Sequence, residues 1–245
     1  MKKTYLTILA VAAIVCCFSS CKKDDNGKKK DPKDEEFVSP ITIDGNFTDW
    51  AAVKAASVTL PTSGTIAKPQ IKTFKVYADK MYINFYMEFD KTNIYVVDML
   101  IDTDNSVATG QVDNWTGGAE VLLQNKVYAW SSDKTTQLEA VNWDPSVFVY
   151  SGEAGSSAWE WTDAVSDGSG VCNTSLPVEL GDNIVAIEGQ IIREMIPVTF
   201  ADTFGLGAII ETRKWSSVGI APAISEEDKA DGKKVDMLRV TIDKK

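Results

Sequence analysis

The sequence predicts an all-β protein, an antiparallel β-sandwich of the jelly-roll or immunoglobulin-like kind. The first observation is the strict alternation from Met81 to Phe89, in which every second residue is apolar and the residues between are mostly polar. A period of two is typical of a β-strand and not of a helix. The second observation is that roughly ten short apolar segments recur along the chain with turn residues between them, a spacing typical of sandwiches.

Residues 1–20 have the composition of an export signal. Two lysines precede an apolar run, and Ser19 and Ser20 stand directly before Cys21. This order of charge, apolar run, small residues and cysteine is typical of a secretory signal. The stretch from Phe18 to Cys21 resembles a bacterial lipobox, in which Cys21 becomes the lipidated first residue of the mature chain. An ordinary secretory signal is the alternative.

Residues 21–36 are predicted to be a flexible tether. After Cys21 the stretch 22–36 holds six basic and six acidic residues and no apolar side chain. Such a segment cannot bury enough surface to offset the entropy of ordering it. The charged start of the tether, residues 22–25, also resembles the surface-export signal of Bacteroidetes lipoproteins. We therefore expect a lipid-anchored protein of the outer membrane that faces the cell exterior and touches the membrane only through its anchor.

Residues 37–245 are predicted to form the sandwich domain. Its opening segment contains Ile41 and Ile43 in a short strand, a turn at residues 44–46, and Trp50, which we expect to be buried because large aromatic side chains usually are. A loop rich in proline and glycine follows over residues 61–70.

The segment 71–101 is the part of the chain around which the rest is organised. Residues 71–78 and 81–89 alternate around a tight turn at Asp79 and Lys80, which predicts a hairpin. The strand 81–89 is expected to be half-buried, with one polar face. Residues 94–101 are apolar on both faces, as is typical of a central strand.

The rest of the chain supplies further strands. They are predicted at residues 119–124 and 126–130 around a turn at Asn125, and at 137–141, 147–150, 184–192, 205–211 and 235–242. Residues 151–175 are predicted to be a long irregular loop, and such loops are usually functional or disordered. One helical turn is predicted over residues 225–231, with Ser225 as its N-cap.

The composition of the domain restricts its chemistry. Residues 37–245 contain 17 basic and 29 acidic residues, a net charge of −12, and the whole chain contains no histidine. A chain this acidic repels nucleic acids and anionic membranes, so neutral ligands or cations are the favoured partners. Cys172 is the single cysteine of the domain, which excludes an intramolecular disulfide. The lack of histidine excludes Ser-His-Asp and Cys-His catalysis and zinc sites built on Cys and His, and we expect no haem.

An ordered series of short segments resembles a known family. The series is IDGNFTDW at 43–50, VYADKMYI at 76–83, IDTD at 101–104, GAE at 118–120, EGQII at 188–192 and FGLG at 204–207. It resembles carbohydrate-binding module family 9 and the related DOMON-like sandwiches. The resemblance implies a jelly-roll-like sandwich that binds the ends of sugar chains between aromatic side chains, often with structural calcium, although some relatives bind haem. The loops around Trp130–Trp161 diverge, so the resemblance does not assign the aromatic residues.

One loop is predicted to bind calcium. Asp102 and Asp104 alternate directly after a predicted strand, and Asp113 follows in the same loop, so three carboxylates are available. Calcium takes six to eight such oxygens. Glu120 is a further candidate ligand. The alternative is a loop whose Asp side chains bond only to the nearby backbone.

Tryptophans in or beside loops are the predicted ligand platforms. Indole rings stack on the apolar C–H faces of sugars, and exposed indoles are costly unless they pack or bind. Trp215 is the first choice because it follows a predicted strand directly, and Trp130 is the second because it ends one. Trp159 and Trp161 are further candidates that would share a face if their segment were a strand. The remaining tryptophans near loops are Trp115 and Trp143.

Arg213, two residues before Trp215, is a candidate for holding a pair of sugar hydroxyls, with a surface ion pair as the alternative.

The sequence therefore favours non-catalytic carbohydrate binding at the cell surface. Two alternatives remain open. One is a glycan-processing enzyme that uses carboxylates of the long loop, Glu153, Glu160 and Asp163. The other is a structural subunit that joins partner proteins in a surface glycan-uptake complex.

Overall fold

The computed structural model describes residues 37–58, 60 and 64–245. The predicted signal (1–20), the candidate lipidation site Cys21 and the predicted tether (21–36) lie outside the described residues. No helix in the described part of the chain is long and apolar enough to cross a membrane.

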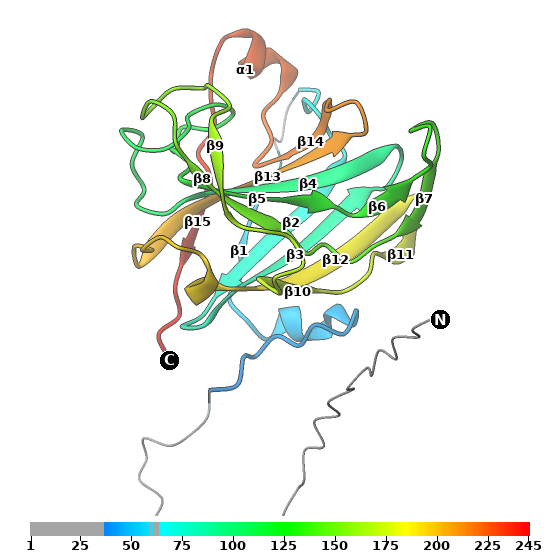
Figure 1. Cartoon of the computed structure of the whole chain (residues 1–245), viewed down its shortest axis with the longest axis horizontal. Helices are drawn as coiled ribbons and strands as arrows, with labels where there is room; N and C mark the ends of the chain where they lie inside the picture. Colours follow the sequence, from blue (N-terminus) through cyan, green and yellow to red (C-terminus); the bar gives the residue numbers. More distant parts are fainter. Residues whose placement is uncertain (1–36, 59, 61–63) are drawn as a thin grey trace, which may run out of the picture. The chain divides into compact units, whose positions relative to one another are not determined.

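Two antiparallel sheets form the fold, which confirms the predicted sandwich (Figure 1). The first, here the β3 sheet, has the order β1 (Ala56–Ser57), β2 (Ile71–Ala78), β3 (Tyr82–Asp90), β12 (Ile184–Ile192), β10 (Cys172–Thr174), with β11 (Val178–Gly181) also paired to β12. The second, here the β4 sheet, has the order β14 (Ser217–Ala221), β13 (Thr203–Thr212), β4 (Ile94–Asp102), β5 (Val121–Lys126), β8 (Ser146–Tyr150), β9 (Trp161–Val165), with β15 (Leu238–Thr241) also paired to β13.

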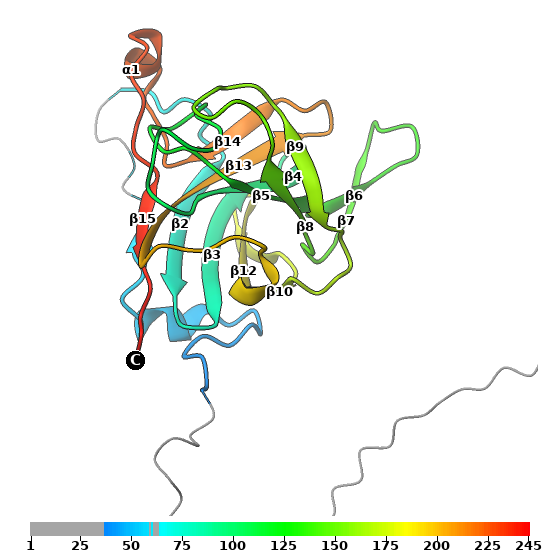
Figure 2. The ribbon, with the colours of Figure 1, turned by 60° about the vertical axis from the view of Figure 1, so that its left-hand side comes forward.

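Smaller elements decorate the sheets. Strands β6 (Tyr128–Trp130) and β7 (Gln137–Ala140) form a separate hairpin, which extends away from the sheets in Figure 2. Short 3-10 helices occupy Phe47–Ala51 and Arg193–Met195. Helix α1 (Glu226–Ala230) begins at the predicted N-cap, because the Ser225 hydroxyl accepts a hydrogen bond from the backbone N–H of Asp228.

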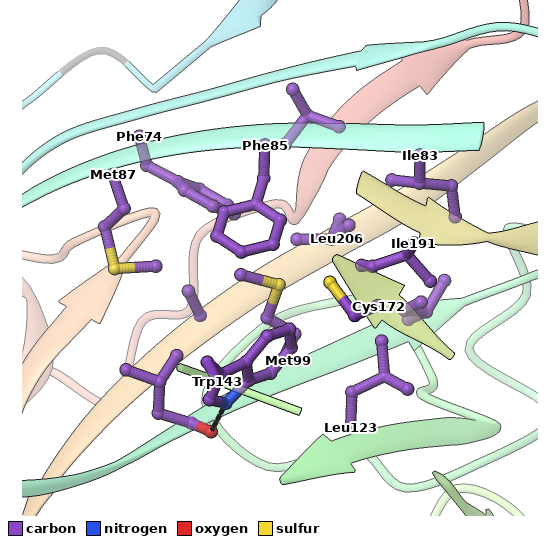
Figure 3. Packing of buried hydrophobic residues seen from close by; sticks show 14 of the residues in the cluster. Phe74, Ile83, Phe85, Met87, Met99, Leu123, Trp143, Cys172, Ile191 and Leu206 are labelled. Atoms are coloured by element: carbon purple, nitrogen blue, oxygen red, sulfur yellow. Dashed lines mark hydrogen bonds between the residues drawn. The ribbon is translucent and has the colours of Figure 1, made fainter. Parts of the chain in front are cut away.

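The main core lies between the inner faces of the two sheets. Figure 3 shows Phe85 of β3 close to Met99 of β4 and to Trp143. Trp143 is fully buried, and its indole N–H donates to the Val97 carbonyl at 3.0 Å. A Cβ at Gly189 would collide with the ring of Phe85, so the glycine of β12 makes room for that ring. Trp143 is therefore a core residue and not a loop platform.

The outer face of the β3 sheet is covered by the segment 41–55. The buried carboxylate of Glu188 accepts hydrogen bonds from the backbone N–H groups of Asp44 (3.1 Å) and Gly45 (2.8 Å) and from the indole of Trp50 (3.0 Å). Bonds to a charged acceptor contribute about 1.5–3 kcal/mol each. The expected burial of Trp50 is confirmed. The prediction that β3 is half-buried is wrong, because this segment also buries Tyr86 on its second face.

The outer face of the β4 sheet is only partly covered. Trp115 lies over it with Leu100, Leu122 and Met237, and its indole N–H donates to the Pro222 carbonyl at 3.0 Å. Trp115 is thus buried like Trp143, although both were predicted to lie in or beside loops. The segments that carry Trp115 and Met237 close one part of this face.

Several boundaries differ from the prediction. Strand β5 continues through Asn125 because Asn125 and Lys126 still pair with Val97 and Val96 of β4, so the turn predicted there is absent from the described fold. The segment 151–175 contains the two strands β9 and β10 and is not wholly irregular. Residues 41–43 form no strand; Ile41 is instead buried against the outer face of the β3 sheet. The hairpin of β2 and β3 and the long strands β12 and β13 follow the prediction closely.

Candidate functional site

The uncovered part of the outer face of the β4 sheet carries a cleft of about 360 Å³. Its lining residues are Gln124 of β5, Glu211 of β13, Trp215 in the β13–β14 turn, and Trp159 just before β9. We call it the tryptophan cleft. Its lining combines two indoles with one amide and one carboxylate, and such a combination of apolar walls with a few polar groups is typical of small-molecule sites.

Trp215 is held in an unusual conformation. Its φ is 59°, in the left-handed region that bulky residues seldom adopt, and its backbone N–H donates to the Thr212 carbonyl at 2.9 Å to close the turn. The indole is 55% exposed and meets the ring of Tyr95 edge to face at 5.9 Å. A strained backbone that presents a large exposed aromatic ring is a common feature of binding sites.

Trp159 is supported from behind by other aromatic side chains. It is 56% exposed, and its ring meets Trp161 edge to face at 5.9 Å. Trp161 in turn contacts Tyr150 at 5.2 Å and packs with Phe148 in the apolar cluster over the β4 sheet. Trp159 therefore lines the cleft, whereas Trp161 is half-buried and positions it.

Beneath the polar floor lies Asp98, a buried carboxyl group in the central strand. Asp98 pairs across the sheet with Gln124 of β5 and with Ile209 of β13, and Glu211 lies two residues beyond Ile209 on the same face. Neither oxygen of Asp98 has a donor in full hydrogen-bond geometry among the described residues, but the side chain of Gln124, its neighbour on β5, is close enough to offset part of the rise in its pKa. Burial, together with the nearby Glu211 carboxylate, raises the pKa of Asp98 to about 8. Asp98 is therefore uncharged at neutral pH, and burial also raises the pKa of Glu211.

Trp130 and Arg213 line a neighbouring cleft and not the tryptophan cleft. This second cleft of about 280 Å³ is lined by Tyr95, Lys126, Ala129, Trp130, Ser131, Ser132, Lys134 and Arg213. We call it the cationic cleft. Trp130 is half-buried, and its indole N–H donates to the Ile94 carbonyl at 3.0 Å. The Arg213 guanidinium lies 4.3 Å from the centre of the Tyr95 ring, a cation–π contact, instead of in a surface ion pair.

The loop that follows β4 from Thr103 onward, here called the acidic loop, brings Asp104 close to Asp102 and Glu120. One carboxylate oxygen from each of the three lies within 4.8 Å of the others. Burial raises the pKa of both Asp102 and Glu120. Glu120 uses one oxygen to accept from the backbone and hydroxyl of Thr103, at 2.7 and 3.0 Å. Its other oxygen, Oε1, is buried and has no donor in full hydrogen-bond geometry in the described chain, although the nearby Thr109 hydroxyl offsets part of the rise in the Glu120 pKa.

Asp113 does not join this group, contrary to the prediction. It lines a separate cleft with Lys68 and Lys234, because the chain leaves the acidic loop between Asp104 and Asp113. The alternative of bonds to the nearby backbone is also realised in part, because the N–H of Ser106 donates to Asp104 at 2.9 Å and to Asp102 at 3.2 Å. The Arg239 side chain also donates to Asp102, at 3.2 Å.

The sequence did not assign Gln124, Glu211, Tyr95 or Asp98 to a site. For Asp98 a signal was present, since it is the one charged residue in the apolar run 94–101. Burying a carboxyl group in a central strand costs folding free energy unless the group is hydrogen-bonded or paired with a charge. Gln124 and Glu211 carry no comparable signal, because polar residues at the ends of strands are common.

No family model matches the sequence, and a search of curated proteins finds no match. Two solved structures are similar in fold. One is a carbohydrate-binding module family 9 from Caldicellulosiruptor kristjanssonii in complex with cellotriose, at 11% identity and a TM-score of 0.41, covering 85% of this chain and 92% of that one. The other is a family 9 module from the same organism in complex with glucose, at 12% identity and a TM-score of 0.43, covering 85% and 94%.

The buried carboxyl of Asp98 predicts a specific dependence of stability on pH. Its folded pKa of about 8 lies above its unfolded value near 3.8, so between these values the folded state holds a proton that the unfolded state has released. This group therefore lowers the free energy of unfolding by about 1.4 kcal/mol for each unit of rising pH in that window. Asp98→Asn, a neutral mimic of the protonated acid, should become more stable than the wild type as pH rises from 5 to 8.

Urea unfolding of both proteins at several pH values measures this difference. Asp163→Asn, at an exposed position on β9, serves as the control and should show no such trend. A difference between Asp98→Asn and the wild type that stays constant from pH 5 to 8 would contradict the assignment.

Proposed function

We propose that this protein binds carbohydrate in the tryptophan cleft and carries out no catalysis there. The observation that carries the proposal is the pair of indoles, Trp159 and Trp215, each more than half exposed, on the walls of one cleft with Gln124 and Glu211 between them. Sugar rings present apolar C–H faces and hydroxyl edges, and this lining offers aromatic surface for the first and hydrogen-bonding groups for the second.

The polar groups suit hydroxyls in particular. The Gln124 side-chain amide both donates and accepts hydrogen bonds, while Glu211, when ionised, accepts only. Sugar hydroxyls donate and accept, so both groups find partners on one ring. The neutral state of Asp98 removes a second negative charge from beneath the floor, which lowers the electrostatic cost of the Glu211 carboxylate.

The carboxyl pair of Asp98 and Glu211 raises the alternative of glycoside hydrolysis, because both have raised pKa values. That chemistry needs two carboxyl groups that both reach the scissile bond. Asp98 is 0% exposed and does not line the cleft, so it cannot transfer a proton to a bound sugar. Glu153, Glu160 and Asp163 are exposed and do not line the tryptophan cleft. Binding is therefore favoured over catalysis.

The cellular setting we propose is that of a lipid-anchored surface protein, tethered by residues 21–36 and placed beside partner proteins of a glycan-uptake system. The support is the order of the signal residues and Cys21. Cys21→Ala should release the protein from the membrane fraction or block its maturation. A wild-type protein without a lipid-modified Cys21 by mass spectrometry would contradict this.

The binding proposal predicts that Trp159→Ala and Trp215→Ala each weaken the affinity for a glycan identified on an array. The expected loss is roughly three- to tenfold per variant, because stacking on one ring contributes on the order of 0.5–1.5 kcal/mol beyond area burial. The measurement is calorimetry with the soluble 37–245 fragment, whose compact unit begins at Val38. Leu180→Ala, an exposed apolar residue on the β3 sheet, is the matched control and should keep full affinity.

Wild-type affinity in both tryptophan variants would overturn the cleft as the binding site. If the array shows no glycan bound at all, the structural-subunit alternative gains instead.

We further propose that calcium stabilises the acidic loop through Asp102, Asp104 and Glu120. The support is the all-oxygen donor set, which suits a hard cation, and the buried Oε1 of Glu120, which no described donor meets in full hydrogen-bond geometry. Bound calcium would share Asp102 with the guanidinium of Arg239, which contacts the same carboxylate. Its role would be to fix the loop after β4 and thus the covering of one part of the β4 sheet.

Calcium should therefore raise the melting temperature. At a concentration one hundred times Kd the gain is about 2.7 kcal/mol, or roughly 5–10 °C for a domain of this size. Asp104→Asn combined with Glu120→Gln should abolish the rise, whereas Asp113→Asn, which lies apart, should leave it unchanged. A melting curve that neither calcium nor a chelator moves would contradict the site.

A further inference from the structure

The cationic cleft concentrates positive charge in an acidic protein. Lys126, Lys134 and Arg213 all line it, and none of its lining residues is acidic. The whole chain carries a net charge of −10, so such a concentration is unexpected from composition. None of these three side chains forms an ion pair with another residue that the structure describes. The cleft thus lacks the counter-charge that three neighbouring cations attract.

The nearest acidic side chain in the sequence, Asp133, keeps its negative charge, but it neither lines the cleft nor forms an ion pair with Lys134 in the described part of the chain. Asp133, beside Lys134, accepts hydrogen bonds from the Ser131 hydroxyl at 2.5 Å and from the N–H and hydroxyl of Thr135 at 3.2 and 2.9 Å. These bonds hold the turn between β6 and β7, and they lower the pKa of Asp133. The same turn, with Lys134 at a φ of 62°, presents the lysine to the cleft.

The cations are held by ordered elements. Lys126 is the last residue of β5, and Arg213 follows β13 directly and lies over the ring of Tyr95 at 4.3 Å. A guanidinium stacked on an aromatic ring keeps its planar donors in a fixed direction, so it loses little entropy when it binds a carboxylate or sulfate. Ser131 and Ser132 add hydroxyl donors to the same lining.

The cationic cleft adjoins the tryptophan cleft at three places. Gln124 and Lys126 are two residues apart on one face of β5, a separation of about 7 Å in an extended strand. Arg213 and Trp215 belong to the same turn. The ring of Tyr95 contacts both Trp215, at 5.9 Å between ring centres, and the Arg213 guanidinium, at 4.3 Å. A sugar residue stacked on Trp215 would therefore place a neighbouring substituent within reach of the cations.

We propose that the cationic cleft is an anion-binding subsite of the carbohydrate site, and that the ligand is a glycan bearing a carboxylate or a sulfate group. This inference rests on the proposed carbohydrate binding and names the class of glycan. Arg213 would hold the anionic group through paired N–H donors, while Lys126 and Lys134 would contribute point charges around it. Recognition of this kind weakens as salt is added, because the side chains face solvent.

The experiment compares matched oligosaccharides that differ only at C6: the neutral alcohol, its uronate and its 6-O-sulfate. Calorimetry with the 37–245 fragment at low and high salt should show at least one anionic form binding about tenfold tighter than the neutral one, as expected for a charge-assisted hydrogen bond. The advantage should shrink at high salt. Comparing the affinities of the uronate and the 6-O-sulfate shows whether the subsite prefers a carboxylate or a sulfate group.

The test variant is Lys126→Gln combined with Lys134→Gln, which removes two charges without touching the stacked Arg213, Tyr95 and Trp215. It should have a smaller anionic advantage than the wild type, because only the part supplied by the Arg213 guanidinium remains, and it should keep the affinity for the neutral sugar. Lys54→Gln, on the other side of the fold beside β1, is the control and should lose neither. Melting curves establish that each variant is folded.

Equal affinity for the three oligosaccharides, or an anionic advantage that is as large in the double variant as in the wild type, overturns the anion subsite and leaves the tryptophan cleft standing. Absence of binding by neutral and anionic glycans alike overturns the proposed function and the subsite together.

Discussion

The constraint on which this structure depends is that each of its two sheets must be covered on its outer face as well as in the shared core. Strands β3, β4, β12 and β13 carry apolar or fully buried residues on both faces, so neither sheet is stable with one face in water. The segment 41–55 covers the β3 sheet, fastened by three hydrogen bonds to Glu188. The segments around Trp115 and Met237 cover one part of the β4 sheet. What remains uncovered is the candidate site.

Asp98, next to the uncovered region, lowers the stability of the fold. A carboxyl group that no described donor meets in full hydrogen-bond geometry opposes folding in the middle of a central strand, and burial keeps it largely protonated. An apolar residue at this position would pack better against Ile209, its partner on β13. The presence of an acid directly beneath Gln124 and Glu211 is thus a local violation of the rules that govern the rest of the strand, and such violations are expected at functional sites.

Sequence reasoning succeeded where periodicity alone decides the structure, as in the hairpin of β2 and β3 and in β12. It failed where burial depends on distant segments. The outer face of β3 looks solvent-facing from its polar residues, yet Tyr86 is covered by a segment some forty residues earlier. The tryptophans show the same limit. Trp115 and Trp143 lie in loop-like sequence just as Trp159 and Trp215 do, but the first two find a surface to cover and the last two do not.

The net charge of the domain favours a neutral ligand, but the charges that line the cationic cleft favour an anionic one. The difference arises because electrostatic interactions weaken with distance in salt solution. At physiological salt, charges separated by more than about 8–10 Å are largely screened from one another. Acidic residues farther away than this therefore slow the approach of an anionic glycan but contribute little once it is bound, whereas Glu211 in the adjoining tryptophan cleft and Asp133 beside Lys134 oppose it at short range. The charged groups that line the cleft itself are Lys126, Lys134 and Arg213, and their contacts favour an anionic group. Composition describes the long-range field, whereas the arrangement of three side chains determines which ligand the site holds.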